Sequence, residues 1–219
     1  MIEKDFGYDP NRLNGGAKQA LLIRHSERFG GTIAKSKDAL TENGIAMAED
    51  LGRKLSKNPP SVIFSSPIPR CIETAKIFVE STKSPLSIQT SSLLGKPGAF
   101  VINGKEIADR IDHHGLTNFA KMWFNGEVPT DLIRSTKDGS ELLLSWVVDV
   151  MRQSNDNFGL FVSHDLILTA VIQEYFQYDL DKEGLLNFLD GFVLQIEDDG
   201  YFIEYRSQKV WIPSPAHWQ

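Results

Sequence analysis

Two histidines and three arginines stand where short apolar runs of the sequence end. They occur in three groups: Arg24-His25-Ser26-Glu27-Arg28, Ser65-Ser66-Pro67 with Arg70, and Ser163-His164-Asp165. Arginine offers a planar, permanently charged fork that pairs with phosphate oxygens, and helix N-termini add aligned backbone N–H groups. Surrounding positive charge also lowers the pKa of a histidine, which keeps its imidazole neutral and nucleophilic near pH 7. These residue types predict phosphoryl transfer with a histidine as the candidate nucleophile.

The elements that must position these residues follow a repeated pattern. Apolar runs at 20–23, 62–64 and 158–162 each lead into a polar turn and then into a helical pattern. Continuous apolar runs are typical of strands buried on both faces of a parallel sheet. We therefore expect an α/β fold of three layers, with helices on both faces of a mainly parallel central sheet. Right-handed crossovers would bring the carboxyl ends of the strands, with their polar groups, to one edge of that sheet.

Several element boundaries are readable. Thr41 is the expected N-cap of a helix that ends before Pro59, and Pro69 fits the first turn of the next helix. A third short strand is expected at 86–88, a helix from Ser140 and an apolar helix over 166–176. The turn signal Asp198-Asp199-Gly200 predicts an antiparallel hairpin over 191–206. The stretch 95–137 is read as an irregular insertion or cap.

Composition bounds the class of protein and identifies no function. A chain of 219 residues with 41% hydrophobic residues suits a single domain with a substantial core. The net charge of -6, without a Lys/Arg cluster, argues against a nucleic-acid binder. A lone cysteine, Cys71, leaves no cysteine pair and indicates a reducing compartment, and the first twenty residues resemble neither a signal peptide nor a membrane anchor. We expect a cytoplasmic protein of open oligomeric state, without membrane association.

Four ordered segments resemble the histidine phosphatase superfamily, which includes phosphoglycerate mutases and acid phosphatases. The segments are LLIRHSER, LTENGIAMAEDLGRKL, IFSSPIPRCIETAKIF and FVSHDLIL, and they span about residues 20 to 172. The resemblance implies a phosphoglycerate mutase-like fold. It also implies a single catalytic domain over 1–219, with a cap at 95–137.

The same resemblance suggests roles for individual residues. His25 would become phosphorylated, while Arg24, Arg70 and His164 would bind the transferred phosphate. Arg28 matches the second arginine of the acid-phosphatase pattern. The proton donor has two candidates, Asp165 and Glu106.

The first candidate proton donor is Asp165, because the acid-phosphatase branch places its acidic residue directly after the late histidine. An aspartate at a helix start is also a common helix cap, so a structural role competes with this one. The second candidate is Glu106, because the mutase-like branch takes its acid from a glutamate in the middle of the chain. No clear family motif surrounds Glu106.

One residue departs from the family pattern. Ser26 stands where the family has glycine after the nucleophilic histidine, so either its hydroxyl contacts the ligand or the loop shifts. The neighbouring His113 and His114 suggest a metal site at first sight. Their side chains should diverge, however, and phosphohistidine chemistry needs neither metal nor cofactor.

The combined expectation is a metal-independent phosphatase that hydrolyses phosphate monoesters through a phosphohistidine. Its partners would be a small-molecule phosphate ester or a phosphoprotein substrate. Two alternatives stay open: a mutase that returns the phosphate to a bound product, and a noncatalytic phosphate-binding module.

Overall fold

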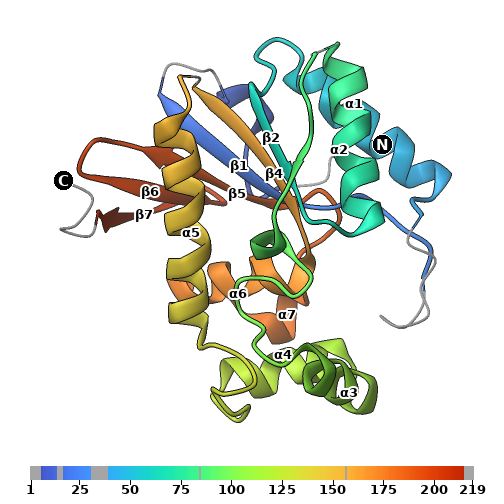
Figure 1. The fold of residues 1–219 in the computed structure, drawn as a ribbon, viewed down its shortest axis with the longest axis vertical. Helices are drawn as coiled ribbons and strands as arrows, with labels where there is room; N and C mark the ends of the chain where they lie inside the picture. The colour runs from blue at the N-terminus through green and yellow to red at the C-terminus, as the bar shows by residue number, and fades with distance from the viewer. Residues whose placement is uncertain (1–5, 14–16, 31–38, 84, 156, 215–219) are drawn as a thin grey trace.

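The computed structural model describes residues 6–13, 17–30, 39–83, 85–155 and 157–214. It contains a mixed sheet with helices on both faces (Figure 1). The strands are β1 (Lys18–Arg24), β2 (Val62–Ser65), β3 (Gln89–Thr90), β4 (Phe158–Ser163), β5 (Gly191–Ile196), β6 (Gly200–Tyr205) and β7 (Gln208–Pro213). The helices are α1 (Glu42–Leu55), α2 (Pro69–Thr82), α3 (Gly104–His114), α4 (Leu116–Phe124), α5 (Thr136–Gln153), α6 (Asp165–Phe176) and α7 (Leu180–Glu183). Short 3-10 helices lie at Pro10–Arg12 (η1) and Ser92–Leu94 (η2).

The sheet is half parallel and half antiparallel. Its strand order is β3-β2-β4-β1-β5-β6-β7, and β3, β2, β4 and β1 are mutually parallel while β5, β6 and β7 join antiparallel. The expectation of a mainly parallel sheet is therefore correct only for the first half. The C-terminal strands return through short turns, and such turns connect antiparallel neighbours because a parallel neighbour needs a long crossover.

The predicted hairpin over 191–206 is confirmed as β5 and β6, but β7 was not predicted. The turn before β7 is built by Arg206 and Ser207, which adopt left-handed backbone angles with φ of 46° and 64°. Two-residue hairpin turns of this kind are usually signalled by Asn-Gly or Asp-Gly. Because Arg206-Ser207 contains no Asn, Asp or Gly, the residues that favour positive φ, the sequence carried no clear sign of this turn or of a third strand.

The apolar run of β1 serves two cores. Ala20 and Leu22 belong to the larger hydrophobic cluster, whereas Leu21 and Ile23 belong to a second cluster on the opposite face, and all four side chains are fully buried. Successive strand residues point to opposite faces, so a strand covered on both sides must be apolar throughout. In Figure 1, α1 and α2 cover one face, and α5 and α6 cover the other. These are the expected three layers.

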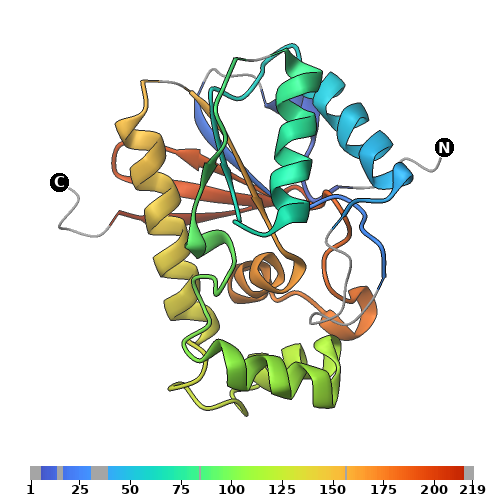
Figure 2. The same cartoon turned by 45° about the vertical axis from the view of Figure 1, so that its right-hand side comes forward.

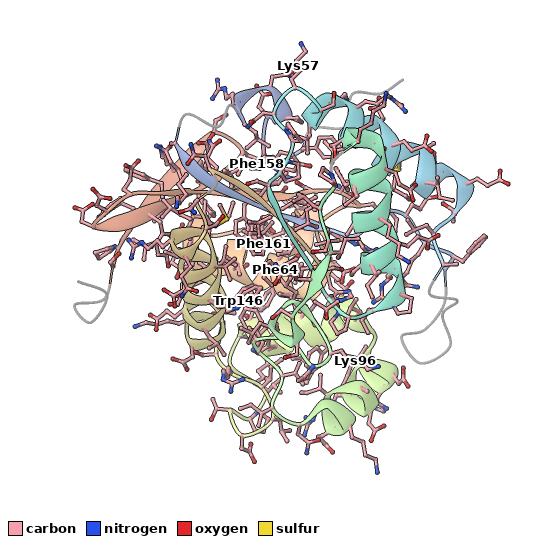
Figure 3. All side chains as sticks on the ribbon, turned by 45° about the horizontal axis from the view of Figure 1, so that its top comes forward. Lys57, Phe64, Lys96, Trp146, Phe158 and Phe161 are labelled. Atoms are coloured by element: carbon pink, nitrogen blue, oxygen red, sulfur yellow. The ribbon has the colours of Figure 1, made fainter. Side chains whose placement is uncertain are left out.

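Aromatic packing consolidates the face under α5. The Phe64 ring stacks on Phe161 at 5.7 Å and meets Trp146 edge-on at 5.2 Å between ring centroids. Figure 3 shows the three side chains together between α5 and the strands. Strands β2 and β4 are thereby tied to α5, behind the strand ends that carry the polar groups.

Helix starts agree with the capping signals. The Thr41 side chain accepts from Gly44 N at the start of α1, and α2 begins at Pro69. Helix α5 begins four residues before the expected Ser140, because the Ser135 side chain caps it by accepting from Asp138 N. The third strand is also displaced, since β3 lies at Gln89–Thr90 rather than at 86–88.

The stretch 95–137 is more regular than expected, because it contains α3 and α4. These helices lie below the sheet, on the side of α6 (Figure 2). The fully buried Phe119 and the nearly buried Trp123 join the larger core, and Trp123 meets Phe100 edge-on at 5.1 Å. The stretch is thus packed onto the main body. Within the described residues, none of the helices is both long and apolar enough to cross a membrane.

Candidate active site

The three polar groups of the sequence meet at the carboxyl ends of β1, β2 and β4. Strand pairing places Arg24 opposite Ser163 and Ser65 opposite Val162. Backbone hydrogen bonds continue past the strand ends, since His25 N donates to Ser163 O at 3.0 Å. The sheet register therefore brings together Arg24 and Ser163, which lie 139 positions apart in the sequence, as expected for parallel neighbours.

Two histidine rings and one arginine form the centre of the site. The centroids of the His25 and His164 rings lie 5.5 Å apart, with the rings edge-on at 68°. Arg70 joins them: its Nε donates to His25 Nε2 at 3.0 Å, and its terminal nitrogen Nη2 lies 3.1 Å from His164 Nδ1. His25 is nearly buried, with 2% of its surface exposed.

The hydrogen bonds assign a tautomer to each ring. Arginine can only donate, so His25 Nε2 and His164 Nδ1 must both accept from Arg70. The other nitrogens then carry the protons: His25 Nδ1 donates to Ser26 O at 2.7 Å, and His164 Nε2 donates to Ser66 Oγ at 2.8 Å. His25 thus presents an unprotonated Nε2 to the site, and His164 is anchored by the serine.

Both histidines are held neutral. Burial, followed by the neighbouring His164, lowers the pKa of His25 well below its ordinary value of 6.5, and the nearby arginines act in the same direction. Burial, followed by the charge of Arg70, lowers the pKa of His164 to about 3. Desolvation and like charge both disfavour the imidazolium form. An unprotonated nitrogen is what a nucleophilic histidine requires.

Arg24 is held by three contacts at the end of β1. One terminal nitrogen forms an ion pair with Asp165 Oδ2 at 2.8 Å, and the other donates to Leu186 O. The Phe188 ring covers the guanidinium face at 4.1 Å from its centroid. The second oxygen of Asp165 accepts from Leu166 N at 2.8 Å. Asp165 therefore lies at the site and also serves the start of α6.

The Ser26 hydroxyl contacts the scaffold. Ser26 is fully buried, its Oγ donates to Gly44 O at 2.6 Å, and its N donates to Thr74 Oγ1 at 3.0 Å. The first of these bonds ties the loop after β1 to α1, and the second ties it to α2. The sequence offered two alternatives for Ser26, a hydroxyl in contact with the ligand or a shifted loop. In the structure the hydroxyl anchors the loop to α1.

The other two residues predicted for the site are Arg28 and Glu106. Arg28 is partly buried and donates to Phe29 O at 3.0 Å, and its charge helps to lower the pKa of His164, so it shares the electrostatic field of the site. Glu106 lies in the first turn of α3, where it pairs with Arg110 at 3.2 Å. The contacts described for Glu106 are local to α3.

Two residues of the site, Gly95 and Phe188, had no sequence signal, and the bond that a third residue, Ser66, makes to His164 was not predicted. Gly95, with φ of 150°, approaches so closely that a Cβ there would lie 2.5 Å from His164 Nε2 and 2.6 Å from Ser66 Oγ. Phe188 lies 5.9 Å from His25 between ring centroids. Ser66 was part of a predicted turn, but its bond to His164 requires the paired strands. A single glycine or phenylalanine outside any recognisable motif gives no indication from the sequence that it will lie at the site.

The fold and the site together define an α/β protein with two neutral histidines and cationic side chains gathered at the strand ends. The family model of the histidine phosphatase superfamily (branch 1) matches residues 20–201. The chain therefore belongs to that superfamily, as its four sequence segments indicated.

Solved structures of the same fold are distant in sequence. YhfR of Bacillus stearothermophilus is 19% identical, with a TM-score of 0.59 over 92% of this chain and 99% of its own. A mycobacterial glucosyl-3-phosphoglycerate phosphatase is 16% identical, with a TM-score of 0.57 over 91% and 100%. Phosphoglycerate mutase from Bacillus anthracis is 15% identical, with a TM-score of 0.56 over 92% and 94%. Comparison with curated protein sequences found no match.

Proposed function

We propose that this protein is a phosphatase that hydrolyses phosphate monoesters through a phosphohistidine on His25. The observation that carries the proposal is the unprotonated state of His25 Nε2, which accepts a hydrogen bond from Arg70 at the centre of the cationic site. Its lone pair becomes available for attack when a phosphate oxygen replaces it as the acceptor for Arg70. Histidine phosphatases and mutases make up the family, and only the destination of the phosphate separates the two activities.

In the first step, His25 Nε2 attacks phosphorus in line with the leaving oxygen. Arg70, Arg24 and Arg28 donate to the nonbridging oxygens, and His164 presents the N–H that bonds Ser66 in the free protein. In the free protein these donors are bonded to protein acceptors, so each must exchange its present partner for a phosphate oxygen before it can stabilise the charge of the transition state. The bond from phosphorus to the ester oxygen breaks as the N–P bond forms.

We assign the proton transfers to Asp165. Its carboxyl group would protonate the departing alcohol, and in the second step it would take a proton from the water that attacks phosphohistidine. The contact with Arg24 at 2.8 Å puts the carboxyl group beside a side chain that we propose binds phosphate. Because an ion pair with arginine favours the carboxylate, Asp165 acts as the acid only after it takes up a proton, once Arg24 has turned to the substrate. Glu106, paired with Arg110 on α3, is the less favoured donor.

Replacement of the nucleophile tests the proposal. His25→Ala should lose on the order of 10³-fold or more of the activity toward a simple aryl phosphate. The matched control is His113→Ala, since His113 is an exposed histidine at the end of α3. The parent protein, quenched during turnover, should carry a phosphate label that survives alkali and is lost in acid, and His25→Ala should carry none. Equal activity of His25→Ala and the parent would overturn the mechanism.

The two alternatives give different results in the same experiment. A mutase would form the labelled histidine but pass its phosphate to a bound acceptor alcohol, with little release to water. A noncatalytic module would bind inorganic phosphate without forming the label. We place the protein in the cytoplasm and expect small-molecule phosphate esters or phosphoproteins as its substrates.

A further inference from the structure

The loop between α7 and β5 brings an aromatic side chain to the site. Phe188 covers the guanidinium face of Arg24 at 4.1 Å, and its ring centroid lies 5.9 Å from that of His25, with the planes at 45°. The side chain is only partly buried. An apolar surface beside the nucleophile is thus left accessible among charged and polar neighbours.

The backbone that presents Phe188 is strained and firmly anchored. The next residue, Leu189, is fully buried and has a left-handed backbone with φ of 61°, a conformation unfavourable for leucine. Tyr8 Oη donates to Leu189 O at 2.9 Å, and Asp190 Oδ1 accepts from Gly7 N at 2.6 Å and from Gly191 N at 2.7 Å. Such strain persists where surrounding contacts fix it, and it is concentrated at functional sites.

The anchoring leaves Phe188 little freedom to move away from His25. Arg24 N donates to Asp190 O at 2.9 Å, and an Arg24 terminal nitrogen donates to Leu186 O, so both ends of the short segment are tied to the residue that precedes the nucleophile. A rigid aromatic ring binds an apolar group with little loss of entropy. The site is therefore arranged for more than phosphate, which needs only the charged groups.

We propose that Phe188 is a specificity-determining residue that contacts the leaving group, so that the protein prefers phosphate esters of aromatic alcohols over those of small alkyl or polar alcohols. The inference rests on the proposed phosphatase function, because it concerns the alcohol that leaves when His25 attacks. An aromatic leaving group packs on the ring that already covers Arg24. A small polar one gains nothing from it.

The preference is measured with two esters of similar intrinsic reactivity, benzyl phosphate and ethyl phosphate. In Phe188→Leu, the ratio of kcat/KM for benzyl phosphate to that for ethyl phosphate should fall about three- to tenfold, the range expected for loss of one aromatic contact. The matched control is Phe202→Leu, because Phe202 packs against Trp211 on the C-terminal strands. Its ratio should equal that of the parent.

Two results would overturn the proposal. If Phe188→Leu loses activity equally on both esters, Phe188 acts only by orienting Arg24, and if the variant keeps the activity of the parent on both esters, Phe188 has no part in selection. Circular dichroism and thermal melting establish that the variant is folded, and Phe188→Met provides a second apolar replacement without a ring should Phe188→Leu fail to fold.

Measuring the binding of phosphonates that cannot be hydrolysed tests the role of Phe188 independently of the proposed phosphatase activity. Benzylphosphonate and ethylphosphonate cannot be hydrolysed, and calorimetry should show tighter binding of benzylphosphonate to the parent and a reduced preference in Phe188→Leu. If the parent hydrolyses neither ester but shows this preference in binding, the phosphatase function fails and the role of Phe188 stands. If it hydrolyses both without preference in rate or binding, the role of Phe188 fails alone.

Discussion

The tautomers and pKa values of the two central histidines provide the sharpest test of the site. The structure requires His25 to carry its proton on Nδ1 and His164 on Nε2, with both rings neutral at pH values where an ordinary histidine is charged. The perturbations are acidification of the parent protein and removal of the shared donor in Arg70→Met. Methionine keeps much of the length of the side chain and removes its charge.

The size of the effect of pH on the free energy of unfolding follows from the difference between the pKa of His164 in the folded protein and in the unfolded chain. The pKa of His164 is about 3 in the folded protein, against an ordinary value of 6.5, so between these values the unfolded chain binds more protons. The free energy of unfolding must therefore fall as pH falls through this window, by at most about 1.4 kcal/mol per pH unit for each such histidine. Between about pH 7 and about pH 5, one histidine accounts for about 2 kcal/mol.

Arg70→Met should reduce this dependence. Removing the charge of Arg70 takes away the second cause of the lowered pKa of His164 and leaves burial, the first cause, so the pKa should rise part of the way toward 6.5. The pKa of His25, which Arg70 also lowers, should move in the same direction. Urea unfolding across the pH range should then give a shallower slope for the variant than for the parent.

Nitrogen NMR reports the tautomers directly. In long-range proton–nitrogen spectra of labelled protein, His25 should show a protonated Nδ1 and His164 a protonated Nε2, both unchanged from about pH 8 to about pH 5. The exposed His113 is an internal reference for an accessible histidine. Detection of imidazolium at His25 near pH 6, or of the opposite tautomer, would refute the hydrogen-bond pattern and with it the unprotonated Nε2 that the proposed mechanism requires.

Two further predictions concern residues that support the site. Ser26→Ala should lower the free energy of unfolding by about 1 to 2 kcal/mol in urea titrations, because it removes the buried bond to Gly44 O, and an unchanged midpoint would contradict the anchoring role. Burial raises the pKa of Asp190 in the folded protein, so its contribution to stability is greatest at low pH and declines as pH rises through its folded pKa. Asp190→Asn keeps an acceptor for Gly7 N and should flatten that decline, whereas Asp190→Ala should be less stable at every pH; equal stability of the two variants would refute this.

Local patterns in the sequence determined most of the scaffold. The apolar run of β1 indicated a strand covered on both faces, and Thr41 and Pro69 marked helix starts, because capping and burial depend on neighbouring residues alone. The polar groups at the strand ends, with His25 and His164 among them, were visible for the same reason. Because the carboxyl ends of parallel strands lie at the same edge of a sheet, the sequence also predicted that these polar groups would lie close together.

Tertiary structure decided the features that depend on contacts distant along the chain. Only the folded chain shows that Arg70 lies between the two rings and so sets their tautomers, and that Ser26 Oγ binds Gly44 O on another element. Phe188 reaches His25 across 163 positions through a left-handed Leu189. A hydrogen bond or ring contact of this kind depends on where two distant backbone segments lie in space. The residue types alone do not predict which partner will be near.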